Sequence, residues 1–208
     1  SKCIGTSLAK LASKIILGNT LKDLEFDSEI MPTNYAVKAP VFPFNKFRKV
    51  DPILGPEMKS TGEVMGQGDT FGEAFAKAVR GAGENIPKEG NVFVSVKDTD
   101  KKHLPNLCEK LIDLGFTITA TKGTAKALEG TNIKVKTINK VLEGRPHIVD
   151  AILNKEIRMI INTTEGRQAT KDSASIRRSA LEHSVFFTTT ISGGFAITES
   201  LEKGVENW

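Results

Sequence analysis

The sequence has few of the residues that build disulfide frameworks, metal centres or aromatic binding platforms. Cys3 and Cys108 are its only cysteines, and no CxxC pair or mixed Cys/His cluster is present. This excludes a recognisable zinc site or disulfide scaffold, and it favours a reducing, cytoplasmic compartment. One Trp and one Tyr argue against a surface that stacks on nucleic-acid bases.

Long apolar runs are missing as well. No stretch reaches the ~18 consecutive apolar residues of a membrane-spanning helix. The first segment, SKCIGTSLAKLASKIILGN, is interrupted by Lys10, Ser13 and Lys14 in a helical rhythm, which is not the pattern of a signal peptide. We therefore expect neither a membrane anchor nor a membrane partner.

What is present is an ordinary globular composition with a small excess of positive charge. Apolar residues make up 39% and charged residues 26% of the 208 positions. A chain of this length and composition can bury a core without metal or disulfide support. Lys and Arg total 29 against 25 Asp and Glu, a formal charge of +4. That excess favours anionic ligands but is too small to indicate a nucleic-acid partner.

Residues 1–82 lack the repeated strand–helix units of an independent α/β domain. Apolar positions from Leu8 to Ile16 share one helical face, and Gly18 is placed to end that helix. A proline-rich stretch follows, containing an extended piece over 35–39. A second helix is expected over 71–79, with Thr70 as its cap. We interpret this part as the end of a larger unit whose beginning is missing.

Residues 83–208 alternate between short apolar strands and amphipathic helices. Strands are expected over 92–96, 116–120, 133–137, 159–161 and 185–188. Helices are expected over 100–114 with Asp100 as the cap, and over 125–128, 148–153, 172–183 and 197–205. This alternation predicts an α/β fold, a doubly wound parallel sheet covered on both faces.

Ligands of such sheets bind where the strands end, so the loops after the strands are the candidate site. Thr121 and Thr124 offer hydroxyls, Gly123 allows close backbone approach, and the following helix offers free N–H groups. Lys101 and Lys140 would supply charge from neighbouring loops. The amide and hydroxyls of the segment 162–164 suit the neutral part of a ligand. Together these loops suggest a phosphate pocket.

Each loop also has a purely structural interpretation. The segment 121–124 is compatible with a simple turn and a capping threonine. Lys101 has acidic neighbours and suits a solvated face, and 162–164 suits a strand end with a helix cap. Only the convergence of several loops on one sheet edge supports a pocket.

No catalytic constellation is evident, because GxSxG, HExxH and Walker A sequences are all absent. His147 and Asp150 form either a base with its orienting group or, by preference, the start of a helix. His103 is expected on an exposed helix side and His183 at a helix end. Arg177 and Arg178 are expected on a salt-bridging surface or interface. The remaining candidates, expected to serve packing, are Phe42, Phe44 and Phe47.

Several sequence segments nevertheless closely resemble those of one family. VKAPVFPFNKFRKVDPILGPEMKSTGEVMG resembles the end of the second ATP-grasp half of the carbamoyl-phosphate synthase large subunit. TATKGTAKAL, NKVLEGRPHI, IINTTEGRQATKDSASIRRSAL and TTTISGGFA resemble its closing methylglyoxal-synthase-like domain. The resemblance implies a C-terminal fragment of such a subunit. It divides the chain into an ATP-grasp remnant, 1–82, and a methylglyoxal-synthase-like allosteric domain, 83–208.

In that family the closing domain binds UMP or IMP and regulates the enzyme, so the resemblance implies an allosteric nucleotide site. The resemblance implies phosphate ligands at Lys101, Thr121, Thr124 and Lys140, and further nucleotide contacts at Asn162 and Thr164. The candidate site also includes their sequence neighbours Lys122, Gly123 and Thr163. Lys122 stands where a histidine is familiar, which adds positive charge. Ornithine, a second effector in some members, matches poorly. Thr189 is retained, but Ala39 and Phe187 replace a glutamate and a tyrosine of that site.

The resemblance also implies what the parent enzyme does. It makes carbamoyl phosphate from glutamine, bicarbonate and ATP with Mg, for pyrimidine and arginine synthesis, together with a small glutaminase subunit in a larger oligomer. This piece is expected to carry no catalysis, cofactor or metal. A lyase of the methylglyoxal synthase type is the alternative, but its GGDQQ segment is missing and Arg145 lies near that position. A purely structural or oligomerising domain is the third possibility.

Overall fold

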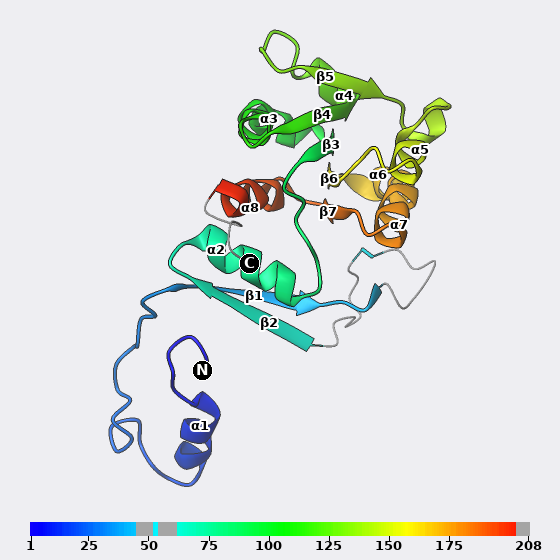
Figure 1. Cartoon of the computed structure of the whole chain (residues 1–208). Helices are drawn as coiled ribbons and strands as arrows, with labels where there is room; N and C mark the ends of the chain where they lie inside the picture. The colour runs from blue at the N-terminus through cyan, green and yellow to red at the C-terminus, as the bar shows by residue number, and fades with distance from the viewer. Residues whose placement is uncertain (45–51, 54–61, 203–208) are drawn as a thin grey trace.

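The computed structural model describes residues 1–44, 52–53 and 62–202, and its centre is a five-stranded sheet (Figure 1). The strands lie in the order β5-β4-β3-β6-β7, and all four pairings are parallel. Their bounds are Gly90–Ser95 for β3, Phe116–Thr121 for β4, Val135–Ile138 for β5, Met159–Asn162 for β6 and Phe186–Thr188 for β7. The predicted α/β fold is confirmed.

Helices cover both faces of this sheet. On one face lie α3 (Leu104–Asp113) and α8 (Ile191–Glu202); on the other lie α5 (Ile148–Leu153) and α7 (Ala174–Glu182) (Figure 1). Strand β3 shows why, because side chains alternate between faces. Val92 and Val94 join the core on the α3 side, whereas Phe93 joins the core on the α5 side. Two buried faces explain why the middle of β3 and most of β6 are continuously apolar.

The first part of the chain forms a smaller antiparallel layer. Strand β1 (Tyr35–Val41) pairs with β2 (Gly62–Gly68), and α2 (Phe71–Gly81) lies across them. Gly66 is required here, since a Cβ at this position would lie 2.0 Å from the Ala74 carbonyl oxygen of α2. Helix α2 in turn packs on α8, where a Cβ on Gly72 would lie 2.4 Å from the Glu199 carbonyl oxygen. The smaller layer therefore contacts the larger one backbone to backbone.

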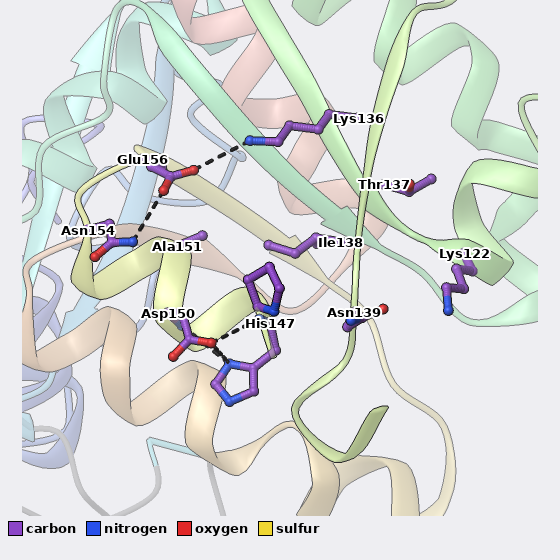
Figure 2. A pocket seen from close by; sticks show the side chains of 11 residues that line it. Lys122, Lys136, Thr137, Ile138, Asn139, His147, Asp150, Ala151, Asn154 and Glu156 are labelled. Atoms are coloured by element: carbon purple, nitrogen blue, oxygen red, sulfur yellow. Dashed lines mark hydrogen bonds and ion pairs between the residues drawn. The ribbon is translucent and has the colours of Figure 1, made fainter. Parts of the chain in front are cut away.

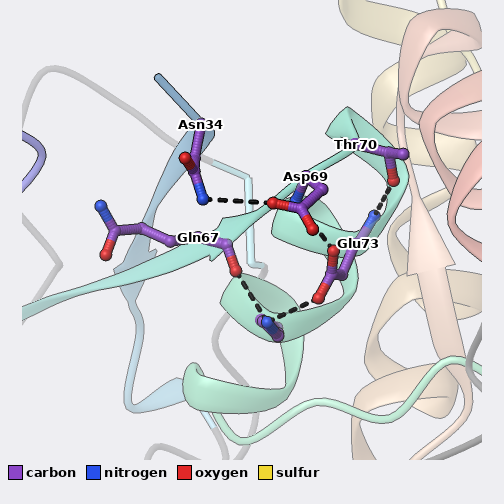
Figure 3. A network of polar contacts seen from close by, with 6 residues as sticks. Asn34, Gln67, Asp69, Thr70 and Glu73 are labelled. Carbon is purple, nitrogen blue, oxygen red and sulfur yellow. Dashed lines mark hydrogen bonds and ion pairs between the residues drawn. The ribbon is translucent and has the colours of Figure 1, made fainter. Parts of the chain in front are cut away.

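A polar network fixes the start of α2 (Figure 3). The Thr70 hydroxyl accepts a hydrogen bond from the Glu73 N–H at 3.2 Å, which confirms the predicted cap. The Glu73 carboxylate accepts from the Asp69 N–H at 2.9 Å and pairs with Lys77 at 2.7 Å. The Lys77 side-chain hydrogen bond is the main reason why the pKa of Glu73 is lowered. The network ties the turn after β2 to the first two turns of the helix.

Helix α1 (Leu8–Ile16) is amphipathic, as predicted, but none of its residues is buried. Ile16 is 84% exposed, and Leu17, which follows the helix, is 81% exposed. Gly18 ends the helix with a positive φ of 101° and an N–H bond to the Ile15 carbonyl. The apolar stripe is thus formed but not covered by the part of the chain that the structure describes.

Several element boundaries differ from the sequence predictions. Asp100 does not cap α3: it lies inside a 3-10 turn, η2 (Asp98–His103), and the helix begins at Leu104 with Pro105 in its first turn. The segment expected to be a turn is itself helix α4 (Lys122–Lys126). The helix expected over 172–183 is preceded by α6 (Gly166–Asp172). Strand β2 was not predicted, and α8 begins at Ile191. Phe47 and the end of the last predicted helix lie outside the described residues.

Candidate functional site

The ends of strands β3 and β4 meet in a cluster of hydroxyl groups at the carboxyl edge of the sheet. The Thr121 hydroxyl donates to the Thr124 oxygen at 3.2 Å, and the Val96 N–H donates to the same oxygen at 3.2 Å. Ser95 lies 3.4 Å from the Thr121 hydroxyl. The Thr124 oxygen accepts both of these hydrogen bonds, so neither of them uses its own hydrogen, and Thr121 and Thr124 are both buried. Sequence reasoning named Thr121 and Thr124 but missed Ser95, a polar residue that ends an apolar strand.

The next strand end adds a backbone connection. The Thr163 hydroxyl accepts from the Lys97 N–H at 3.0 Å, and the Thr163 N–H donates to the Ser95 carbonyl at 2.9 Å. Asn162, which precedes it, is the register partner of Ser95 across the β3–β6 pair. The ends of β3, β4 and β6 are therefore joined by hydrogen bonds into one polar surface.

Asn162 carries an unusual feature of this edge. Its side chain is 3% exposed, and its amide nitrogen, Nδ2, has no hydrogen-bond partner among the described residues. A buried donor without a partner costs ~1–3 kcal/mol of stability. Such atoms are uncommon in folded proteins, and a bound acceptor would relieve the cost.

The lysines of the predicted site sit on loops at the same edge. Lys101 lies in η2 after β3 and forms an ion pair with Asp98 at 2.7 Å. Its side-chain hydrogen bond lowers the pKa of the exposed Asp98 carboxyl. Lys140 follows β5 and is exposed, as are Lys122 and Gly123 in α4. The edge thus combines hydroxyl and amide donors with ammonium groups on neighbouring loops.

Two cavities lie beside the outer members of the predicted set, and neither is lined by Ser95, Thr121, Thr124 or Asn162. The smaller, about 300 Å³, lies between β5 and α5, and Lys122 reaches its wall (Figure 2). Lys136 and Glu156 also line it and form an ion pair at 3.5 Å (Figure 2). The larger, about 730 Å³, lies between the two layers and is lined by Thr164, Phe187 and Thr189, among others. The two outer members of the predicted set, Lys122 and Thr164, therefore face different cavities.

The larger cavity has aromatic walls. Phe42 and Phe44 stack with ring centroids 5.2 Å apart, and both line it together with Phe187. Glu84 also lines it, and desolvation raises the pKa of that carboxyl. Thr189 and Phe187, the positions compared with an ornithine site, thus share one cavity. Whether an amine binds there stays a prediction.

His147 and Asp150 have the geometry of a helix start. The His147 Nδ1 accepts from the Asp150 N–H at 3.3 Å, and the Asp150 carboxylate accepts from the His147 N–H at 3.0 Å (Figure 2). Arg145 adds an ion pair to the same carboxylate at 3.6 Å. The carboxylate of Asp150 is therefore engaged at the start of α5. This geometry favours the structural interpretation of the pair over a base with its orienting group.

The prediction that Arg177 lies on the surface is wrong. Arg177 is 3% exposed, and its guanidinium donates to the Thr170 carbonyl at 2.8 Å, so it is not a surface residue. Its long side chain joins α7 to α6 instead. Arg178, one position on, is exposed, and the predicted exposed His103 and helix-ending His183 lie as expected.

Two further observations concern classes of function. Within residues 1–44, 52–53 and 62–202, no helix has the length and apolar character needed to cross a bilayer. In the same residues no group of three or more His, Cys, Asp or Glu side chains is arranged to hold a metal ion.

The sequence that forms most of the parallel sheet matches a known family. Residues 103–189, which include the strands β4 to β7, match the family of MGS-like domains.

The whole chain has close relatives as well. It is 59% identical over 206 residues to the carbamoyl phosphate synthase large chain of Pseudomonas putida and 60% identical to that of Pseudomonas syringae pv. tomato. The large chain of Pseudomonas aeruginosa is 55% identical. Each match covers 99% of this chain, which spans about 19% of the length of these relatives. The chain is highly similar to the C-terminal part of the carbamoyl phosphate synthase large chain.

Proposed function

We propose that this chain is the regulatory end of a carbamoyl phosphate synthase large chain and that the carboxyl edge of its sheet binds a nucleoside monophosphate, UMP or IMP. The observation that carries the proposal is the Asn162 amide, a buried donor without a partner beside a cluster of hydroxyls. A phosphate or ribose oxygen is the kind of acceptor that this edge lacks. The similarity to large chains of the synthase supports the same assignment.

Different residues would contact different parts of the nucleotide. Thr124 donates its free hydroxyl hydrogen to the phosphate, and Thr121 joins it after turning away from Thr124. Lys101 and Lys140 supply charge, and each charge-assisted hydrogen bond contributes roughly 1.5–3 kcal/mol. Lys101 gives up its pairing with Asp98 at small cost, because that carboxylate is 90% exposed and its ion pair is screened.

The neutral part of the nucleotide meets the amide side of the edge. Asn162 and Thr164 both offer donors and acceptors to the ribose or base. Thr164 faces the larger cavity, which leaves room for a base on that side. Lys122 adds positive charge from the opposite side.

The remainder of the large chain is the proposed partner. The apolar face of α1, which the described residues leave exposed, is suited to pack against it. Helix α2, which belongs to the same first part of this chain as α1, packs on α8 of the parallel-sheet layer. Effector binding would then be coupled to the ATP- and Mg-dependent chemistry of the synthase, at a coupling free energy of typically ~1–3 kcal/mol. In this proposal catalysis, the glutaminase subunit and assembly into an oligomer belong to the complete enzyme, and this chain carries the control.

Titration calorimetry with UMP, IMP and inorganic phosphate tests the proposal. Lys140→Ala should weaken UMP binding by roughly 10- to 100-fold, because one charge-assisted contact is lost. Lys134→Ala is the matched control: it removes an equally exposed lysine at the opposite end of β5 and should leave the affinity within about twofold. Unchanged affinity in Lys140→Ala with an intact fold would contradict the phosphate role.

A further inference from the structure

Thr163 is bonded on both sides to the exit of strand β3. It is 5% exposed, its hydroxyl accepts from the Lys97 N–H at 3.0 Å, and its N–H donates to the Ser95 carbonyl at 2.9 Å. Its backbone N–H is therefore fully used inside the protein. In this respect Thr163 differs from its neighbour Asn162, whose amide nitrogen has no partner in the described part of the chain.

Lys97 is the residue that precedes η2, the turn that carries Lys101. The structure gives η2 no side-chain cap from Lys97, and the Asp100 N–H bonds back to the Lys97 carbonyl at 3.1 Å. The hydroxyl of Thr163 supplies the partner that the Lys97 N–H would otherwise lack. A residue on β6 thus holds the start of the turn that follows β3.

We infer that Thr163 is a positioning residue, which fixes the Lys101 turn against the Asn162 end of β6 and does not itself contact the ligand. This inference rests on the proposed nucleotide site, and it revises the grouping of Thr163 with the binding residues. Its consequence is specific. Loss of the hydroxyl should weaken anion binding through Lys101, whereas a direct ligand contact would act whether or not Lys101 is present.

We call the hydrogen bond between the Lys97 N–H and the Thr163 hydroxyl the brace. It is tested first without any ligand, by amide hydrogen exchange of the full chain. Thr163→Val keeps the shape but removes the acceptor, so exchange at the Lys97 amide should accelerate about tenfold or more. Thr163→Ser keeps the hydroxyl and should restore slow exchange. Unchanged exchange at Lys97 in Thr163→Val would overturn the brace.

The role in binding is tested by calorimetry with inorganic phosphate and UMP in a double-mutant cycle. Thr163→Val should lower the affinity about tenfold in the wild-type background and less than about twofold in a Lys101→Met background, because coupled residues are not additive. An equal loss in both backgrounds would overturn positioning through Lys101. Failure of the wild-type chain to bind either probe would overturn the proposed function, whereas the exchange experiment judges the brace independently.

Discussion

At the scale of single residues, Asn162 is where stability and binding oppose each other. Among the residues that the structure describes, its Nδ2 is buried without a partner, at a cost of ~1–3 kcal/mol that the proposed ligand would remove. Asn162→Leu should therefore raise the free energy of unfolding of the ligand-free chain by about 1 kcal/mol, while abolishing its stabilisation by UMP. Urea unfolding with and without UMP measures both effects.

Asn91 provides the matched control for this substitution. Its side-chain oxygen accepts from the Thr119 hydroxyl at 2.9 Å at the other end of the sheet, so its amide is in use. Asn91→Leu should lower the free energy of unfolding by about 1 kcal/mol and leave the UMP effect intact. Equal destabilisation by the two substitutions would contradict the assignment of Asn162.

Cys108 makes the free energy of unfolding depend on pH in the alkaline range. Burial, with a smaller effect of Glu109, raises the pKa of this thiol from 9.0 to about 12. Above pH 9 the unfolded thiol ionises while the folded one stays protonated, so this residue's contribution to stability falls as pH rises. The expected loss is about 1.4 kcal/mol per pH unit between the two pKa values.

Comparison with Cys108→Ala isolates that effect from other groups that titrate in the same range. The free energy of unfolding of the wild type, relative to that of the variant, should fall steadily between about pH 8.5 and 10.5. The slope should approach about 1.4 kcal/mol per pH unit above pH 9. Parallel curves for the two proteins would show that the thiol is not shielded in the way described.

At the scale of elements, the α2–α8 crossing depends on one glycine. A Cβ on Gly72 would lie 2.4 Å from the Glu199 carbonyl oxygen, too close for any side chain. Gly72→Ala should therefore cost about 1–3 kcal/mol by forcing the helices apart. Gly81→Ala, at the end of the same helix, meets only Val64 at 3.4 Å and should be neutral or slightly stabilising. Thermal unfolding of both variants checks the pair, and equal midpoints would contradict the close crossing.

Elements with a strong local signal were predictable from the sequence. Helix α5 has the predicted bounds, and the Leu104, Leu107 and Leu111 stripe of α3 is buried as expected. The capping of α2 by Thr70 also followed from a local rule. Elements defined by tertiary contact were not predictable: Gly66 and Gly68 of β2 lie where a Cβ would meet α2, and β-propensity does not register that need.

The candidate site was predictable only in part, for a similar reason. The topology of a parallel sheet placed Thr121, Thr124 and Asn162 on one edge, because all strand ends meet there. It gave no means to tell the proposed ligand contact, Asn162, from the proposed positioning residue, Thr163, since both are polar residues at the end of β6. Arg177 was misplaced because nothing in its local sequence signals that the Thr170 carbonyl accepts its hydrogen bond.

At the scale of the whole molecule, two layers share one interface. The β1–β2–α2 layer contacts the parallel sheet through α8, and the cavity of about 730 Å³ lies between them. The boundary predicted near residue 82 therefore falls just after a helix that packs on both layers, and as a domain boundary it stays a prediction.

The central claim, an effector site at the carboxyl edge, is tested most directly by thermal unfolding of this chain with UMP, IMP and inorganic phosphate. Ligand at ~100 times its dissociation constant should stabilise the fold by ~2.7 kcal/mol, which raises the unfolding midpoint by about 5–10 °C. The account predicts a larger shift with a nucleotide than with phosphate, and the order of UMP and IMP gives the preference. No shift with any of the three, in a cooperatively folded sample, would contradict it.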